Sequence, residues 1–187
     1  MANPNAAIGF RATKHLAGGL PNRFNRYHIA TALASNIARG DAVIPTATSK
    51  NVDRPGGATV RLVGVFDGVI YVDANGDTQF RPRWASGQTT LANSVIDCFV
   101  YDDPKTLFEV QYSATLALAD IGSFGDLVIG VSNASTGQSA DTVNNAGVGT
   151  NIKIQDIVGR PENDYGLNAK IIVQIALHYN AGAPTAI

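Results

Sequence analysis

Residues 59–84, TVRLVGVFDGVIYVDANGDTQFRPRW, decide the fold of this chain. Apolar and polar side chains alternate with a period of two in 61–66 and again in 69–73, which is typical of strands with one face turned inward. Asn75-Gly76 favours a tight type I′ hairpin turn, and Asp67-Gly68 offers a second turn of similar chemistry. The stretch therefore predicts a three-stranded meander closed by the only tryptophan. It holds no histidine, cysteine or glutamate, so we expect scaffold rather than a reactive site.

The composition of the chain favours one all-β domain. Of its 187 residues, 45% are hydrophobic and 16% are charged, and 19 are glycine. The charged share lies below the roughly 25% of an average globular protein, so hydroxyl and amide groups supply much of the polar surface. Part of that surface could be covered by partners.

Charge and cysteine content exclude several function classes. The formal net charge is −1 and no basic run occurs, so we expect no nucleic-acid groove held by counterion release. No apolar run approaches the roughly 20 residues of a membrane span, and we expect neither a membrane partner nor a signal peptide. The single cysteine, Cys98, excludes an internal disulfide and is interpreted as a small buried hydrophobe.

Short strands follow one another along the rest of the chain. The last one alternates most clearly, with Ile171, Val173, Ile175, Leu177 and Tyr179 on one face. Several short strands at this spacing are typical of a barrel or a sandwich. Strands are predicted at 27–33, 42–46, 95–101, 107–112, 127–131, 152–158 and 169–179.

The chain divides into three parts by pattern. Residues 1–26 lack a sustained period and scatter basic residues among apolar ones, so we expect an extended N-terminal arm. Residues 27–180 form the single β domain, and 181–187 a loose C-terminal tail. Within the domain, 132–151 is a long Gly/Ser/Thr/Asn-rich loop, and loops of this length are usually functional or mobile.

None of the polar groups in the sequence forms a recognisable catalytic or metal-binding motif. The turn at 73–77 resembles half of a calcium loop but lacks the glycine and the glutamate that such a loop needs, and a hairpin explains it. Asp102-Asp103 is interpreted as turn chemistry, and Arg39-Gly40-Asp41, the integrin-binding tripeptide, as a turn entering a strand. We therefore expect no enzyme, no cofactor and no metal.

Three passages carry a resemblance to a known family. They are 62–68 with the turn at 73–77 and the aromatic run to Trp84; 100–104 leading to 108–111; and 157–163 followed by 169–178. Together they span roughly Ala6 to His178. On these passages the chain resembles the capsid cement, or head decoration, proteins of tailed bacteriophages.

The resemblance implies a fold and a role. It implies a small β-barrel or β-tulip on the outer surface of an icosahedral phage head, present in the host cytoplasm during assembly. Such a protein clamps neighbouring major capsid subunits, often as a homotrimer, with a dimer as the alternative. It has no enzymatic role, and its N-terminal arm commonly reaches along the capsid.

Candidate capsid contacts follow from the arm. Its apolar anchors and basic residues are the side chains that a shell could capture: Ile8, Phe10, Arg11, Leu16, Arg23, Phe24 and Arg26. Two other protein classes stay open, namely another virion part, such as a tail tube or head-fibre base, and a carbohydrate-binding module that uses Trp84, Tyr71 and the long loops. An enzyme is the third alternative.

Overall fold

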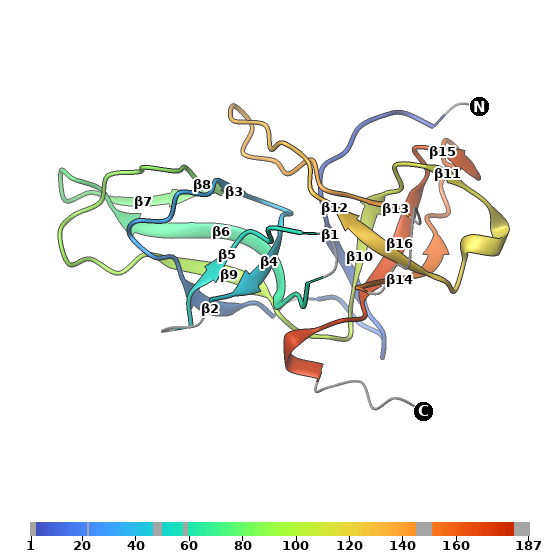
Figure 1. Ribbon diagram of the computed structural model, residues 1–187, viewed down its shortest axis with the longest axis horizontal. Coiled ribbons are helices and arrows are strands. Elements are labelled where there is room, and N and C mark those ends of the chain that lie inside the picture. Colours follow the sequence, from blue (N-terminus) through green and yellow to red (C-terminus); the bar gives the residue numbers. More distant parts are fainter. Residues whose placement is uncertain (1–2, 22, 47–49, 58–59, 145–150, 182–187) are drawn as a thin grey trace.

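The computed structural model describes residues 3–21, 23–46, 50–57, 60–144 and 151–181. They form an elongated molecule of two lobes, each built on a six-stranded antiparallel sheet, with two further two-stranded sheets (Figure 1). The all-β prediction is confirmed. In the described parts of the chain neither large sheet closes into a barrel by a continuous ladder. Only isolated bridges among these residues, His28 with Asn51 in the first lobe and Tyr112 with Val143 in the second, link strands across the open sides.

The first lobe contains the central meander. Its sheet has the order β2-β9-β6-β4-β5, with β7 paired to the other part of β6, and the short β3 and β8 pair beside it. The strands are β2 (Asn25–His28), β3 (Ile37–Ala38), β4 (Ala42–Pro45), β5 (Val52–Asp53), β6 (Gly64–Val72), β7 (Thr78–Arg81), β8 (Arg83–Trp84) and β9 (Asp97–Tyr101).

The second lobe combines the first strand of the chain with the C-terminal half. Its sheet has the order β1-β10-β16-β14-β12-β13, and β11 pairs with β15 at one end. The elements are β1 (Arg11–His15), β10 (Thr106–Gln111), β11 (Thr115–Leu116), β12 (Phe124–Val128), β13 (Thr142–Asn144), β14 (Ile152–Ile157), β15 (Gly166–Leu167), β16 (Lys170–Ile175) and the 3₁₀ turns η1 (Leu118–Asp120) and η2 (Tyr179–Ala181).

The turn predicted at Asp67-Gly68 is wrong. β6 runs through it as one strand, and the register against β9 shifts between Phe66 and Gly68, so the extra residue is a β-bulge. A Cβ at position 68 would lie 3.2 Å from the carbonyl oxygen of Arg81 on β7. The glycine is therefore needed for close packing of a neighbouring strand rather than for a reversal of the chain.

The hairpin predicted at Asn75-Gly76 is confirmed, but its turn is not type I′. Gly76 has a φ of 92°, whereas Asn75 is not among the described residues with positive φ. The Asp73 carboxylate organises the turn instead, since its Oδ1 accepts from the backbone N–H groups of Asn75 and Asp77 at 2.9 and 3.1 Å. The residues that resemble half of a calcium loop thus hold a five-residue turn.

Each lobe has its own hydrophobic core. In the first lobe Trp84, on β8, is fully buried, with its ring edge-on to Tyr71 at 5.7 Å. The meander before it has two strands, β6 and β7, and not the predicted three, because β6 runs through Asp67-Gly68. Cys98 is buried in the same core, and this burial raises the pKa of its thiol to about 12.

In the second lobe the predicted alternation of the last strand is confirmed for Ile171, Val173 and Ile175, which are buried. Its predicted extension to Tyr179 is wrong, because β16 ends at Ile175 and Tyr179 lies exposed in η2.

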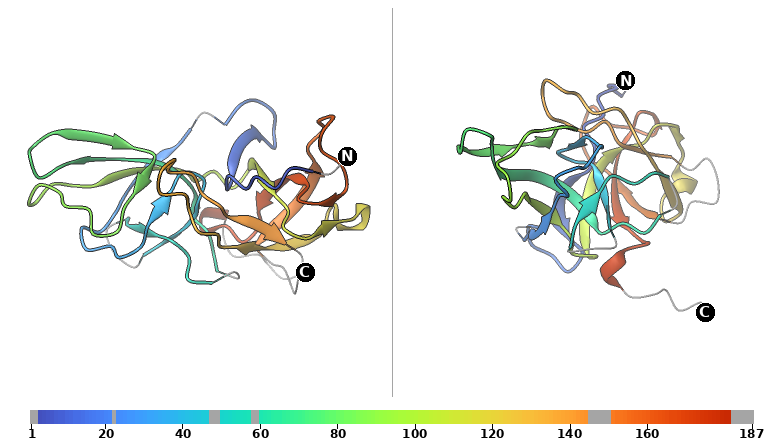
Figure 2. Two further views of the ribbon diagram at one scale, coloured as in Figure 1. Left: turned by 90° about the horizontal axis from the view of Figure 1, so that it is seen from above. Right: turned by 60° about the vertical axis from the view of Figure 1, so that its left-hand side comes forward.

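The N-terminal segment lies along both lobes. β1 pairs with β10 as an edge strand of the second lobe, and Phe10 is only 3% exposed. The connection from β1 to β2 then crosses to the first lobe (Figure 2). Residues 10–15 are therefore part of the second lobe, while the contact with a capsid expected of 1–26 stays a prediction. Of the expected tail, 182–187 fall outside the described residues.

Candidate functional site

The outer face of the first sheet carries a row of aromatic rings. Alternation along β9 turns Cys98 and Val100 into the core, and Phe99 and Tyr101 to the other side. The Phe24 ring lies 5.0 Å from Phe99 and 6.1 Å from Tyr101. Phe80, on β7, lies 6.2 Å from Phe99 on its other side. We call Phe24, Phe80, Phe99 and Tyr101 the aromatic face.

Strand pairing explains why rings from three separate segments meet. Phe99 pairs with Arg26 of β2 on one side and with Gly68 of β6 on the other. A Cβ at position 68 would lie 3.3 Å from Cζ of Phe80, so the missing side chain leaves room for that ring. The bulge and its glycine thus let Phe80 reach Phe99 across β6.

The aromatic face is open to solvent. Phe80 is 64% exposed and Phe24 is 47% exposed, whereas Trp84 in the core of the same lobe is fully buried. Large exposed aromatic side chains gathered in one place are unusual for a surface that stays in water, and they are typical of a protein-binding surface.

Ion pairs border the aromatic face. Asp97 Oδ1 lies 2.9 Å from His28 Nδ1, and Asp97 Oδ2 lies 3.3 Å from Arg26 Nη1. Arg39 contacts Asp67 at 2.8 Å. The arginines are 66% and 53% exposed, so each pair contributes little to stability but gives the border a polar, partly basic character.

A cleft of about 530 Å³ continues this surface toward the second lobe. Tyr101 belongs to both, and burial, followed by the charge of Asp67, raises the pKa of its hydroxyl group. The remaining walls come from the N-terminal segment, the turn before β4 and the loop before β13: Ile8, Phe10, Arg11, Arg39 and Gln138.

The residues predicted as capsid contacts fall into three groups. Ile8 and Arg11 line the cleft, and Phe24 and Arg26 lie on or beside the aromatic face. Phe10 forms a cleft wall, but its ring packs on Phe108 at 6.2 Å and is buried, so it is chiefly a core residue.

The other two predicted contacts lie on the connection between β1 and β2. Leu16 is 53% exposed, and its backbone N–H donates to the carbonyl oxygen of Lys105. Arg23 is exposed.

Three members of the aromatic face were missed by sequence reasoning: Phe80, Phe99 and Tyr101. Alternation in 95–101 could have separated Phe99 and Tyr101 from the core residues between them. The contact of Phe80 with Phe99 could not be found in this way, because it depends on the bulge at Gly68.

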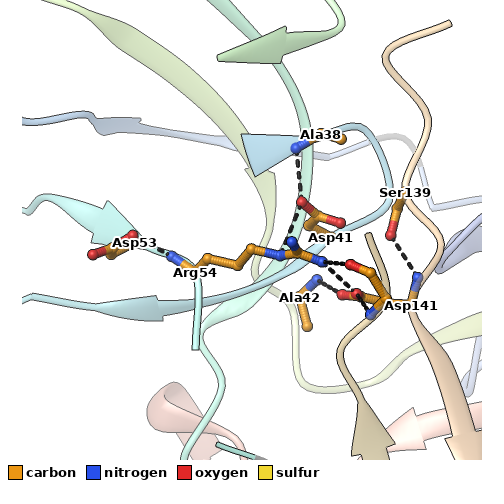
Figure 3. Close-up of polar contacts among 8 residues, drawn as sticks. Ala38, Asp41, Ala42, Asp53, Arg54, Ser139 and Asp141 are labelled. Atoms are coloured by element: carbon orange, nitrogen blue, oxygen red, sulfur yellow. Dashed lines mark hydrogen bonds and ion pairs between the residues drawn. The ribbon is translucent and has the colours of Figure 1, made fainter. Parts of the chain in front are cut away.

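A buried ionic cluster joins the two lobes. Arg54, after β5, donates through Nη2 to Asp141 Oδ1 at 2.7 Å, and its Nε lies 3.3 Å from Asp41 Oδ2 (Figure 3). Asp141, before β13, also accepts from the backbone of Ala42 and Gly130. Both carboxylates are fully buried, so this cluster binds lobe to lobe rather than a ligand.

The cluster holds two carboxylates and one guanidinium. Burial first, and the nearby Asp141 second, raise the pKa of Asp41 from 3.8 to about 6. Burial also raises the pKa of Asp141, although Arg54 opposes the effect. Because Asp41 is buried, Arg39-Gly40-Asp41 cannot present its carboxylate to an integrin, in line with its interpretation as a turn.

Asp102 and Asp103 face different partners. Asp102 accepts from Asn25 and from the Tyr27 hydroxyl, both at 2.8 Å, whereas Asp103 lies 3.3 Å from His15 Nε2. They hold the N-terminal segment to the end of β9, as their structural interpretation implies.

No cluster of three His, Cys, Asp or Glu side chains within the described residues could hold a metal ion. The described ranges contain no helix of the length and apolarity that crossing a membrane requires.

No protein-family model, curated protein or solved structure matches this chain. Its function must therefore be inferred from its own surface and from the resemblance of its sequence.

Proposed function

We propose that this chain is a structural protein of a tailed-phage virion. It binds the outer surface of the head and stabilises the shell by bridging neighbouring major capsid subunits, with no catalytic role. The resemblance of three sequence passages to head decoration proteins supports the class of protein. The aromatic face supports a binding role, and it is the surface that we propose binds the capsid.

The observation that carries the proposal is the exposed row Phe80–Phe99–Phe24. Aromatic side chains bury a large area at low entropic cost, and they are enriched among the residues that dominate protein interfaces. The polar border formed by Arg26 and Asp97 resembles the rim that surrounds such a centre. The adjoining cleft, with Ile8 and Arg11, adds an indentation that can receive a protruding side chain.

The same face suits a protein partner better than a sugar. The rings of Phe24 and Phe99 are inclined at 67°, and those of Phe80 and Phe99 at 40°, so they do not form a flat platform for a sugar ring. Tyr71 and Trp84, the residues expected for carbohydrate binding, are 6% and 0% exposed. A tilted apolar surface interlocks with the side chains of another protein.

Stabilisation would follow from mass action. A protein that binds the assembled shell and not its separate subunits shifts the equilibrium toward the shell. A face that contacts two neighbouring subunits, or a trimer that presents three faces, adds avidity to contacts that are individually weak.

Co-sedimentation with empty expanded heads tests the proposal. The variant Phe24→Ser/Phe80→Ser should bind at least about tenfold more weakly than the unchanged chain, because interface aromatics contribute about 2 kcal/mol or more. The matched control is Leu118→Ser/Val131→Ser, which removes two exposed apolar side chains, 72% and 91% exposed, from the second lobe. Equal binding by all three proteins would show that the aromatic face is not the capsid-binding surface. No binding by any of them would contradict the proposed binding to the capsid.

Electron microscopy of the isolated chain distinguishes head decoration from the alternative role as another virion part. Rings or tubes formed without heads would favour a tail tube or head-fibre base, and their absence together with head binding would favour decoration.

A further inference from the structure

A second cleft, of about 430 Å³, lies between the β6–β7 hairpin of the first lobe, extended by Pro82 and β8, and the loop 133–138 of the second. Its volume falls in the range of small-molecule sites. Gln79 and Arg81 line it, and these β7 side chains point away from Phe80, which lies between them in sequence. The cleft is therefore on the other side of β7 from the aromatic face, and it stays open when that face is covered.

The loop wall of this cleft is fixed in place. Asn133 Oδ1 accepts from the backbone N–H groups of Ser135 and Thr136, and the N–H of Gly137 donates to the Asn133 carbonyl. The Gly137 carbonyl accepts from the N–H of Arg39 at 3.0 Å, which ties the loop to the first lobe. Such a wall loses little entropy when a ligand binds.

Gly137 sets how closely the loop approaches the hairpin. Its φ is 68°, and a Cβ there would lie 2.8 Å from Cγ of Pro82. The loop and the hairpin are thus in direct contact at this point, and the cleft is preformed beside it.

The hairpin wall presents an ordered set of polar groups. Asp73 Oδ2 accepts from Gln79 Nε2, and Gln79 Oε1 accepts from Arg81 Nη2, both at 3.0 Å. Arg83 lies on the same wall. Across the described ranges, no carboxylate lies within ion-pair distance of the Arg81 or Arg83 guanidinium, so both cations are available to an anion.

The lining combines three kinds of contact. Arg81 and Arg83 offer paired N–H donors that match a carboxylate. Ser135 and Thr136 offer groups that both donate to and accept from hydroxyls. Pro82 supplies apolar surface. A ring with a carboxylate, several hydroxyls and a C–H face satisfies all three.

We propose that this cleft binds an acidic sugar, a uronic acid unit of an anionic polysaccharide. The carboxylate lies against Arg81 and Arg83, the hydroxyls against Ser135 and Thr136, and the C–H face against Pro82. This proposal does not rest on capsid binding. For a protein that also sits on a virion, the cleft would hold the particle to acidic polysaccharide at a cell surface.

Titration of the full-length chain with a galacturonic acid trimer, followed by NMR or calorimetry, tests the proposal. We expect saturable binding, at least about tenfold tighter than that of the neutral galactose trimer, since the arginines contribute charge-assisted hydrogen bonds. Acetate and a triglutamate peptide serve as anions without the sugar ring. Absent binding, or equal binding of the neutral trimer, of acetate or of triglutamate, would overturn the proposal.

Variants locate the binding. Arg81→Gln and Arg83→Gln each should weaken trimer binding about tenfold, whereas the matched control Arg23→Gln, outside the cleft, should not change it. Head co-sedimentation of the two cleft variants, Arg81→Gln and Arg83→Gln, should be unchanged, so a failure of the sugar proposal can be told apart from a failure of the capsid proposal. Unaltered trimer binding by both cleft variants would overturn the assignment of the site.

Discussion

The outer faces of the two large sheets differ in how their side chains are satisfied. On the second lobe, long polar side chains bond to one another across strands: Gln155 with Gln174 at 2.9 Å, and Lys170 with Gln111 at 2.6 Å. On the first lobe, the corresponding positions hold the half-buried Phe99 and Tyr101, whose rings pack against the exposed Phe24 and, for Phe99, Phe80.

The polar face is also partly covered by the chain itself. Arg160 binds Glu109 through both guanidinium nitrogens at 2.8 and 2.7 Å. The N-terminal segment lies nearby, with the backbone N–H of Ala6 donating to Gln111 and Asn5 accepting from it. One sheet thus supplies its own partners, whereas the other leaves an apolar surface for a partner from outside.

The largest expected effect on stability comes from removing the buried cation that joins the two lobes. Arg54→Met removes the cation shared by Asp41 and Asp141 and leaves two buried carboxylates without a counter-charge. We expect a loss of about 3–5 kcal/mol in the free energy of unfolding, measured by urea denaturation. A loss below about 1 kcal/mol would show that the cores alone hold the lobes together.

The pH dependence of stability tests the buried ionic cluster in a second way, through the titration of Asp41. The folded-state pKa of Asp41 lies above 3.8, so the native state binds this proton more tightly than the unfolded chain. The stabilisation is complete below pH 3.8 and is lost as the pH rises through about 6. We expect a decrease of about 2–3 kcal/mol across this window, measured by urea denaturation. Asp41→Asn should flatten the curve, and an unchanged slope would contradict the assignment.

The polar face should lose stability when its bidentate pair is broken. Arg160→Gln leaves Glu109, whose side chain is 8% exposed, without its guanidinium partner. We expect a cost of about 1 kcal/mol, because Arg160 itself is 44% exposed and solvent screens the pair. Thermal unfolding checks the effect, and Lys105→Gln, an exposed cation without such a pair, serves as control.

The aromatic face should show the smallest stability effect. Phe80→Ser removes a ring that is 64% exposed and packs against Phe99 at a tilt of 40°, so the free energy of unfolding should change by less than about 0.5 kcal/mol. A cost above about 2 kcal/mol in urea denaturation would mean that Phe80 serves the fold rather than a partner.

The sequence predicts local features of this fold well. The strands β9, β14 and β16 were predicted, and each alternates between a buried face and a more exposed one. β10 was predicted as well, although all six of its residues are buried. The Asn75-Gly76 hairpin was found from its turn chemistry.

The sequence does not predict features that depend on pairing between distant segments. Asp67-Gly68 has the composition of a turn, and only its pairing with β9 shows that it is a bulge. Residues 132–151 were predicted as one long loop because of their polar composition. Part of this stretch is the strand β13, which forms by pairing with β12. The two-lobed arrangement likewise depends on which sheet each strand joins.

Only part of the candidate surface was predicted from the sequence. The residues named in advance were apolar anchors or basic residues of an N-terminal segment without a sustained period: Ile8, Arg11, Phe24 and Arg26. Their neighbours Phe99 and Tyr101 alternate with the core residues Cys98 and Val100, so their face could have been predicted from the sequence, whereas the approach of Phe80 could not.

A cryo-electron microscopy reconstruction of heads decorated with the full chain tests the central claim most directly. The difference between the two outer faces predicts that Phe24, Phe80 and Phe99 lie against capsid subunits, with the Gln155–Gln174 face of the second lobe turned to solvent. A map with the aromatic face in solvent and the polar face on the shell would contradict the account.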